Sequence, residues 1–268
     1  MNTILKRAVL VASLSCALVS SVVSAQDSSI PRTPDGKPDF NGIWQTLGTA
    51  HLDLETHVAR AGPVVAMGAL AAFPGGMGVV EGGKIPYKPE ALLTKQDNQS
   101  NWLERDPLVK CYLPGVPRAT YIPYPFQIFQ APDATLISYQ FAGADRIVYM
   151  DKPDFESQVD SWMGHNIGHW EGDTLVITVS GQMPDTWFDQ SGNWHSYQMV
   201  VEERYTLMGP NHIQYEATIT DPEVFTQPWT ISMPLYRRME PNAMMLEFKC
   251  VEFVEELLYG QFRKPSVE

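Results

Sequence analysis

From Pro125 onward the chain breaks into short runs in which apolar residues occupy every second position, and clusters of Gly, Pro, Asn or Asp separate these runs. Because successive side chains of a strand point to opposite faces, this alternation predicts half-buried strands joined by tight turns. The expected strands cover 126–130, 135–141, 146–150, 163–171, 174–180, 195–207, 213–220, 229–236 and 244–251, with one earlier strand at 42–46. The pattern therefore predicts consecutive antiparallel hairpins.

An open sheet of this width would leave two long edges with unpaired backbone groups, and closing the sheet on itself removes both. We therefore predict an all-β fold, an antiparallel meander closed into a barrel of about eight to ten strands. The side chains expected to face inward around a cavity are Tyr197, Met199, Val201, Tyr215, Trp229, Met233 and Phe248. Tyr205, Leu207 and Glu203 fall on the same face. An unpaired carboxylate there would be costly, so an arginine such as Arg146 or Arg237 is the expected partner of Glu203.

Residues 48–118 depart from the alternating pattern and are predicted to form an insertion or lid. Gly and Ala are frequent within 62–83, and the stretch 89–105 begins at a proline and carries apolar residues at helical spacing. The insertion should therefore be partly helical. A second short helix is expected at 252–260, and the whole of 26–268 is predicted to be a single domain.

The first 25 residues have the features of a secretory signal peptide. Lys6 and Arg7 precede an apolar stretch, and small residues before Ala25 offer a cleavage site, so the mature chain should begin near Gln26 in the periplasm or outside the cell. Serines dilute the apolar stretch, which argues against a membrane anchor. Cys16 lacks the apolar residue that a lipid-attachment site has three positions earlier. No membrane insertion is expected once the signal is removed.

Removal of the signal peptide leaves two cysteines, Cys111 and Cys250, in an oxidising compartment. A disulfide between them is expected, and two separate buried thiols are the alternative. Loss of the two cations of the signal takes the formal net charge from −12 to −14. Nucleic acid is therefore not an expected partner, because it would be repelled.

Several stretches carry a resemblance to known proteins. The run 39–44, Asp-Phe-Asn-Gly-Ile-Trp, resembles the Gly-x-Trp opening of lipocalin-like (calycin) barrels, in which the tryptophan closes one end of the barrel. The stretches 110–118, 168–176 and 221–230 resemble a widespread family of exported bacterial proteins of unassigned function. The resemblance implies a lipocalin-like barrel, export and one domain, and it implies no reaction. The long insertion after the first strand departs from lipocalins.

Counting register back from the turn at 172–173 sets His165 opposite Ser180, at the open end of a hairpin. The chain returns at His195, which should lie near the same rim, with Asp189 in the connecting loop. These three residues are candidates for acid/base catalysis: His195 as general base or acid, Asp189 to orient it, and His165 to bind or protonate a substrate oxygen. The predicted chemistry is that of a cofactor-free lyase, isomerase or hydrolase.

The function that we expect first is binding of an apolar or aromatic small molecule at the barrel mouth, and the enzyme described above is the alternative. The residues expected to contact the ligand are Tyr124, Trp187, Trp194, Tyr197 and Met199. No metal is expected, because His165 and His169 lie four residues apart on one strand, about 13 Å at strand rise. No nucleotide-binding or nucleophile-elbow motif occurs, and no cofactor is expected.

Overall fold

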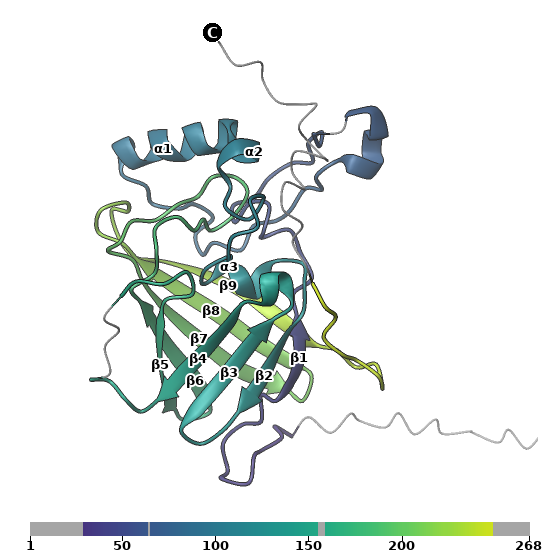
Figure 1. Cartoon of the computed structure of the whole chain (residues 1–268), viewed down its shortest axis with the longest axis vertical. Coiled ribbons are helices and arrows are strands. Elements are labelled where there is room, and N and C mark those ends of the chain that lie inside the picture. Colours follow the sequence, from purple (N-terminus) through teal and green to yellow (C-terminus); the bar gives the residue numbers. More distant parts are fainter. Residues whose placement is uncertain (1–28, 64, 155–158, 249–268) are drawn as a thin grey trace, which may run out of the picture.

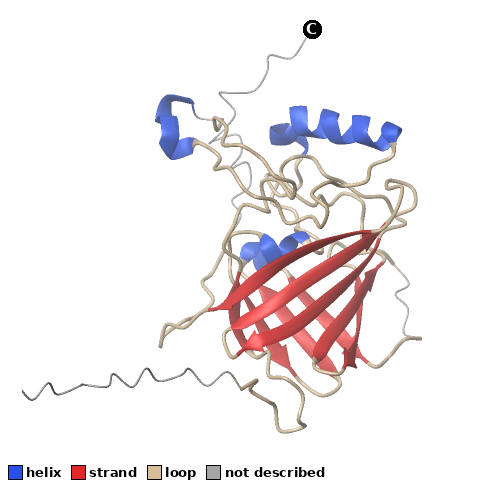
Figure 2. Ribbon diagram, turned by 180° about the vertical axis from the view of Figure 1, so that it is seen from behind, coloured by secondary structure: helices blue, strands red, loops and turns tan. Residues whose placement is uncertain are grey.

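The computed structural model describes residues 29–63, 65–154 and 159–248, and within them nine strands form one closed barrel in sequence order (Figures 1 and 2). The strands are β1 (Gly42–Gln45), β2 (Phe126–Gln130), β3 (Ala134–Tyr139), β4 (Asp145–Met150), β5 (His165–Glu171), β6 (Thr174–Ser180), β7 (Val200–Gly209), β8 (His212–Thr220) and β9 (Trp229–Arg237). The predicted all-β barrel is therefore confirmed.

One pairing differs from the predicted meander, which was antiparallel throughout: β4 and β5 run parallel. The other neighbours, including the closing pair β1 and β9, are antiparallel. Strand direction reverses at every antiparallel pair, and a closed ring needs an even number of reversals. An odd number of strands therefore requires a parallel pair, and the long connection after Met150 supplies it. The predicted register of the next hairpin is confirmed, with His165 opposite Ser180.

The largest differences in extent concern the strands predicted at 195–207 and 244–251. β7 begins at Val200 and not at 195, because the backbone N–H and the hydroxyl of Ser196 both donate to the carboxylate of Asp221, at 2.6 and 2.9 Å. Side-chain acceptors of this kind compete with a strand ladder. The described part of the predicted strand at 244–251 is irregular, and its remainder lies outside the described residues, as does the helix expected at 252–260.

Inward-facing side chains fill the barrel. Along β7 the predicted inner face is confirmed for Val201, Tyr205 and Leu207, which are 0 to 6 % exposed. Trp44 on β1 is fully buried, and its indole N–H donates to the carbonyl oxygen of Phe40 at 2.8 Å. The tryptophan of the run 39–44 is thus part of the core, and the resemblance to the Gly-x-Trp opening stays an expectation.

The insertion forms a lid over one end of the barrel and is partly helical, as predicted (Figure 2). It contains the 3-10 helix η1 (Val65–Ala71) and the helices α1 (Pro89–Ser100), α2 (Trp102–Arg105) and α3 (Arg118–Tyr121). All four residues of α3 are buried, and Figure 1 shows this helix at the mouth of the barrel. A further 3-10 helix, η2 (Phe141–Gly143), joins β3 to β4. The lid end of the barrel therefore carries most of the non-strand structure.

Candidate functional site

His195 is a buried histidine whose two ring nitrogens both contact protein groups. Nδ1 lies 2.9 Å from the carbonyl oxygen of Ser196, so this nitrogen carries the ring proton and donates it. Nε2 then accepts from the hydroxyl of Thr186 at 2.7 Å. Burial lowers the pKa of His195 below its ordinary value, so the ring is neutral. These contacts describe a structural histidine that holds the loop 181–199 together.

Asp189 is fully buried, and its partners lie in the lid and in its own loop, 181–199. It accepts from the backbone N–H of Leu54 at 2.8 Å and from the side-chain amide of Asn193 at 2.6 Å. Burial, and next the nearby carboxylate of Asp53, raise its pKa to about 7 against the opposing effect of those hydrogen bonds. Its hydrogen bonds in the described structure do not include one to His195. The predicted orienting role is therefore not formed.

His165 lies on the outer face of the barrel wall. The next residue on β5, Asn166, points inward and accepts from Arg146 at 3.0 Å, so the side chain of His165 must point outward. Its ring centroid lies 6.1 Å from that of Tyr149 on β4. His195 is buried in the loop 181–199, whereas His165 points away from the barrel interior, so the two imidazoles face different surroundings. The acid/base group predicted from register is not assembled around one substrate position.

The residues predicted to contact a ligand are also dispersed. Trp187 and Trp194 pair with each other through their backbones, and the indole of Trp194 donates to the carbonyl oxygen of Ala91 in α1 at 3.1 Å, which attaches the lid helix. Met199 is buried below the lid. Tyr197 is 64 % exposed in the loop before β7, so the prediction that it faces inward is wrong.

Tyr124 belongs to an aromatic cluster beside η2. Its ring centroid lies 5.6 Å from that of Phe141 and 5.1 Å from that of Phe248. Phe248 was expected inside the barrel and instead packs in this cluster, because the segment before it is not a strand and does not alternate across the wall. Among the other predicted inward residues, Val201, Tyr215, Trp229 and Met233 are buried.

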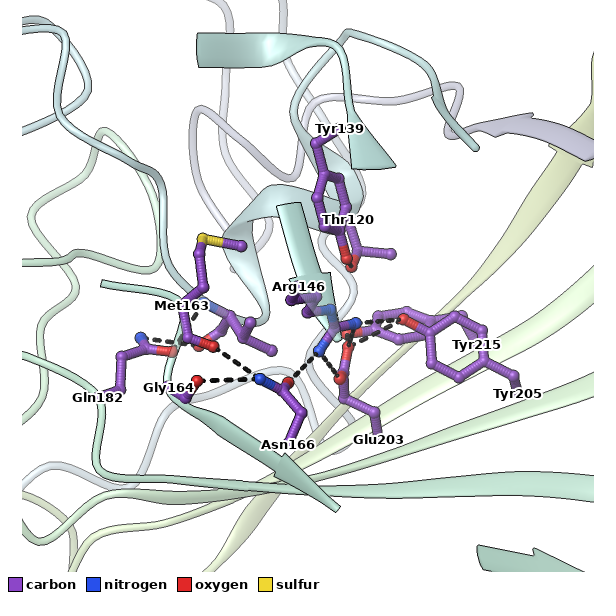
Figure 3. A network of polar contacts seen from close by, with 11 residues as sticks. Thr120, Tyr139, Arg146, Met163, Gly164, Asn166, Gln182, Glu203, Tyr205 and Tyr215 are labelled. Carbon is purple, nitrogen blue, oxygen red and sulfur yellow. Dashed lines mark hydrogen bonds and ion pairs between the residues drawn. The ribbon is translucent and has the colours of Figure 1, made fainter. Parts of the chain in front are cut away.

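The centre of the barrel holds a polar network built on an ion pair (Figure 3). The guanidinium of Arg146 on β4 contacts both carboxylate oxygens of Glu203 on β7, and both side chains are fully buried. The hydroxyls of Tyr205 and Tyr215 donate to Glu203 Oε1 at 3.0 and 2.8 Å. The predicted pairing of Glu203 with Arg146 is therefore confirmed.

The network is electrostatically balanced. Burial opposes the charge of Arg146, but the carboxylate of Glu203 more than offsets this effect and holds the pKa of Arg146 well above its ordinary value. Burial, and next Glu203, raise the pKa of Tyr205 and Tyr215 as well, so both hydroxyls stay protonated and act as donors. These side chains occupy the position where a lipocalin-like barrel would hold a central ligand.

A pocket of about 430 Å³ opens instead through the barrel wall, between the end of β1 and the lid. β1 pairs with β9 only at Trp44 and Gln45, and farther along β9 the lid residues 79–81 take the place of β1, with Val80 bridged to Ile231. Pro234, which lacks a backbone N–H, lies between these two pairings. The pocket is lined by 46–50, 75–79, Tyr121 and 232–234, and we call it the seam pocket.

Sequence reasoning did not find the seam pocket, because four separate parts of the chain build it and a local pattern does not bring them together. Its surface is largely apolar, and Leu47 and Met77 at its rim are 68 and 89 % exposed. Gly48 lines the pocket at a position where an added Cβ would meet no atom within 4 Å. The arrangement offers an open, mostly apolar recess that reaches the core side chain of Met233.

Three further predictions concern cysteines, metal and membrane. Cys250 lies outside the described residues, so its disulfide with Cys111 stays a prediction. No cluster of three metal-ligating side chains occurs in the described parts of the chain. In the same parts, no helix has the length and apolar character needed to cross a bilayer.

Together the fold and the pocket define a closed nine-stranded mixed β-barrel with a lid and an opening in its wall. The chain matches no protein-family model, no curated protein and no solved structure. The implied membership of an exported bacterial family therefore stays a prediction. The closed barrel supports a lipocalin-like binding fold in general, and any narrower function has to be argued from the site.

Proposed function

We propose that this protein is an exported binding protein for an apolar or aromatic small molecule, and that the seam pocket is its binding site. The observation that carries the proposal is an open, mostly apolar recess of about 430 Å³ in the wall of a barrel whose centre is filled by the Arg146–Glu203 network. Recesses of about 300 to 1,000 Å³ with apolar linings are typical of small-molecule sites. The pocket, not the barrel centre, is therefore the place for a ligand.

The geometry favours a binder over the alternative of a His/Asp enzyme. The catalytic scheme needs Asp189 to orient His195 and needs His165 within reach of the same substrate. Instead, Asp189 binds Leu54 and Asn193, and His165 faces outward. Binding in the seam pocket requires none of these contacts.

The test uses a neutral fluorescent probe, N-phenylnaphthylamine, titrated into the mature protein. Wild type should enhance its fluorescence and saturate. Gly48→Phe adds a ring at the pocket rim without a clash at Cβ, so we expect the affinity to fall at least about tenfold while the thermal midpoint stays close to wild type.

Ala131→Phe is the matched control, because it adds the same ring to the exposed β2–β3 turn at the end of the barrel away from the lid. It should bind the probe as wild type does. A wild-type protein that never binds the probe would overturn the proposed function. Equal binding by Gly48→Phe and wild type would overturn the assignment of the seam pocket.

A further inference from the structure

Beside the seam pocket lie three buried side-chain nitrogens that have no hydrogen-bond partner among the described residues: His51 Nδ1, His57 Nε2 and Arg118 Nε. A buried polar atom without a partner costs roughly 1 to 3 kcal/mol, so three of them at one place call for a physical reason. His51 follows Ala50, which lines the pocket, and Arg118 begins the helix α3 whose last residue, Tyr121, lines it too.

His57 lies directly behind the pocket wall. A Cβ placed on Gly76 would be 3.2 Å from His57 Nε2 and 2.0 Å from the hydroxyl oxygen of Thr49, and both Gly76 and Thr49 line the pocket. Because residue 76 has no side chain, the Thr49 hydroxyl oxygen lies where a Cβ would be, beside the imidazole. A ligand oxygen that took the place of this hydroxyl would lie close enough to Nε2 for a hydrogen bond.

The hydrogen bond of the other ring nitrogen of His57 determines what Nε2 can do. Nδ1 lies 2.8 Å from the carbonyl oxygen of Glu55 and therefore donates a ring proton to it. An imidazole nitrogen opposite such a donor accepts a hydrogen bond in the neutral ring and donates one in the protonated ring.

Burial and two basic side chains act on His51. Burial first, then Arg118 and His57, lower the pKa of His51 to about 4. Arg118 is itself paired with Asp106 through both terminal nitrogens, at 2.7 and 2.8 Å, and Asp189 also acts on it. A partner that brings an acceptor and a negative charge would offset the effect of Arg118 and His57 on His51.

We infer that the ligand of the seam pocket is an organic acid, whose apolar or aromatic body lies against Leu47, Met77 and Met233 and whose carboxylate faces His51 and His57, with Arg118 behind them. This inference rests on the proposed function and names the chemical class of its ligand. A carboxylate supplies acceptors for the three nitrogens and a charge opposite to that of Arg118.

Binding of such a ligand takes up protons. The imidazole of His51, whose pKa of about 4 leaves it neutral in the free protein, becomes charged beside a carboxylate. Affinity must then rise as pH falls toward the pKa of the ligand acid, by up to about tenfold per pH unit for each proton taken up. A neutral ligand of the same shape gains nothing from this change. The pH dependence of affinity therefore separates a charged head group from apolar contact alone.

The experiment compares naphthylacetic acid with its methyl ester by titration calorimetry at pH 8 and pH 6. We expect the acid to bind at least tenfold more tightly at pH 6 than at pH 8 and more tightly than the ester at pH 6, with proton uptake that shows as a dependence on buffer ionisation enthalpy. His57→Gln should weaken the acid about tenfold and leave the ester unchanged. The wild-type comparison of acid and ester keeps the test decisive if that variant does not fold.

Equal, pH-independent affinities for acid and ester, with both abolished by Gly48→Phe, would overturn the acidic head group and leave the seam pocket in place. Absence of binding by the acid, the ester and N-phenylnaphthylamine together would overturn the proposed function and this inference with it. Tighter binding of the ester than of the acid at pH 6 would also overturn the inference.

Discussion

Glu203→Gln is the substitution that should damage this fold most for the smallest change in shape. It keeps the volume of the side chain but removes the charge that balances Arg146, and it places an amide NH2 group against guanidinium or hydroxyl donors. Both side chains are fully buried, so water cannot compensate. Breaking a buried ion pair by neutralising one partner costs about 3 to 5 kcal/mol. A loss of this size is a large part of the 5 to 15 kcal/mol that typically stabilises a domain.

The assay is thermal and urea unfolding of the oxidised mature protein. For a domain of this size the expected loss corresponds to a thermal midpoint lower by roughly 6 to 20 °C. Glu240→Gln is the matched control, because Glu240 also pairs with an arginine, Arg238, at 2.9 Å, but on the surface. Exposed pairs contribute little, so this variant should unfold close to wild type.

Replacing both members of the pair, as Arg146→Met with Glu203→Leu, should recover most of the loss, because no uncompensated buried charge remains. A loss below about 1 kcal/mol in Glu203→Gln would refute the reasoning, since it would mean that the guanidinium finds another partner or reaches water. A double variant no more stable than Glu203→Gln would show that the tyrosine hydroxyls, and not the charge of Arg146, set the cost.

Three further predictions concern pH, the cysteines and export. The raised pKa of Asp189 means that the folded protein binds a proton there more tightly than the unfolded chain, so the stability contributed by the protonated carboxyl is lost as pH rises from about 4 through about 7. Between pH 5 and pH 8 wild type should lose about 3 kcal/mol more than Asp189→Asn in urea unfolding, and parallel pH profiles would contradict this. Mass spectrometry of a non-reduced digest should find the peptides of Cys111 and Cys250 linked, whereas alkylation of both thiols in the native protein would end that claim. Expression with residues 1–25 in a bacterial host should yield a periplasmic protein that begins near Gln26, and an uncleaved chain in the cytoplasm would contradict export.

Much of the barrel could be predicted because strand periodicity is a local property. The alternation around Glu203 placed Val201, Tyr205 and Leu207 on the inner face and required a buried partner such as Arg146, since an unpaired carboxylate there is costly. The parallel pair β4 and β5 could not be predicted, because pairing direction depends on the path of the long connection and on how many strands the ring contains.

The candidate site was less predictable for a related reason. Register counting placed His165 correctly opposite Ser180, but register alone does not say which face of the sheet a side chain takes. The inward turn of Asn166 toward Arg146 decides that. Likewise, residues before Val200 form a loop and not a strand because Ser196 donates hydrogen bonds to Asp221. Asp221 is distant in sequence, so a local pattern could not predict these hydrogen bonds.

The seam pocket follows from how this barrel closes. β1 contributes only four residues and meets β9 at two of them, so it cannot cover the length of β9. The lid completes the wall through two ladder-like hydrogen bonds, from Glu81 N–H to the carbonyl oxygen of Thr230 and from Ser232 N–H to that of Val79, each 2.9 Å. Wall and lid are thus one structure at this position, and the recess between them persists because Pro234 offers no donor to close it. A first strand long enough to pair with the whole of β9 would close this opening, and the centre of the barrel, filled by Arg146 and Glu203, would not replace it.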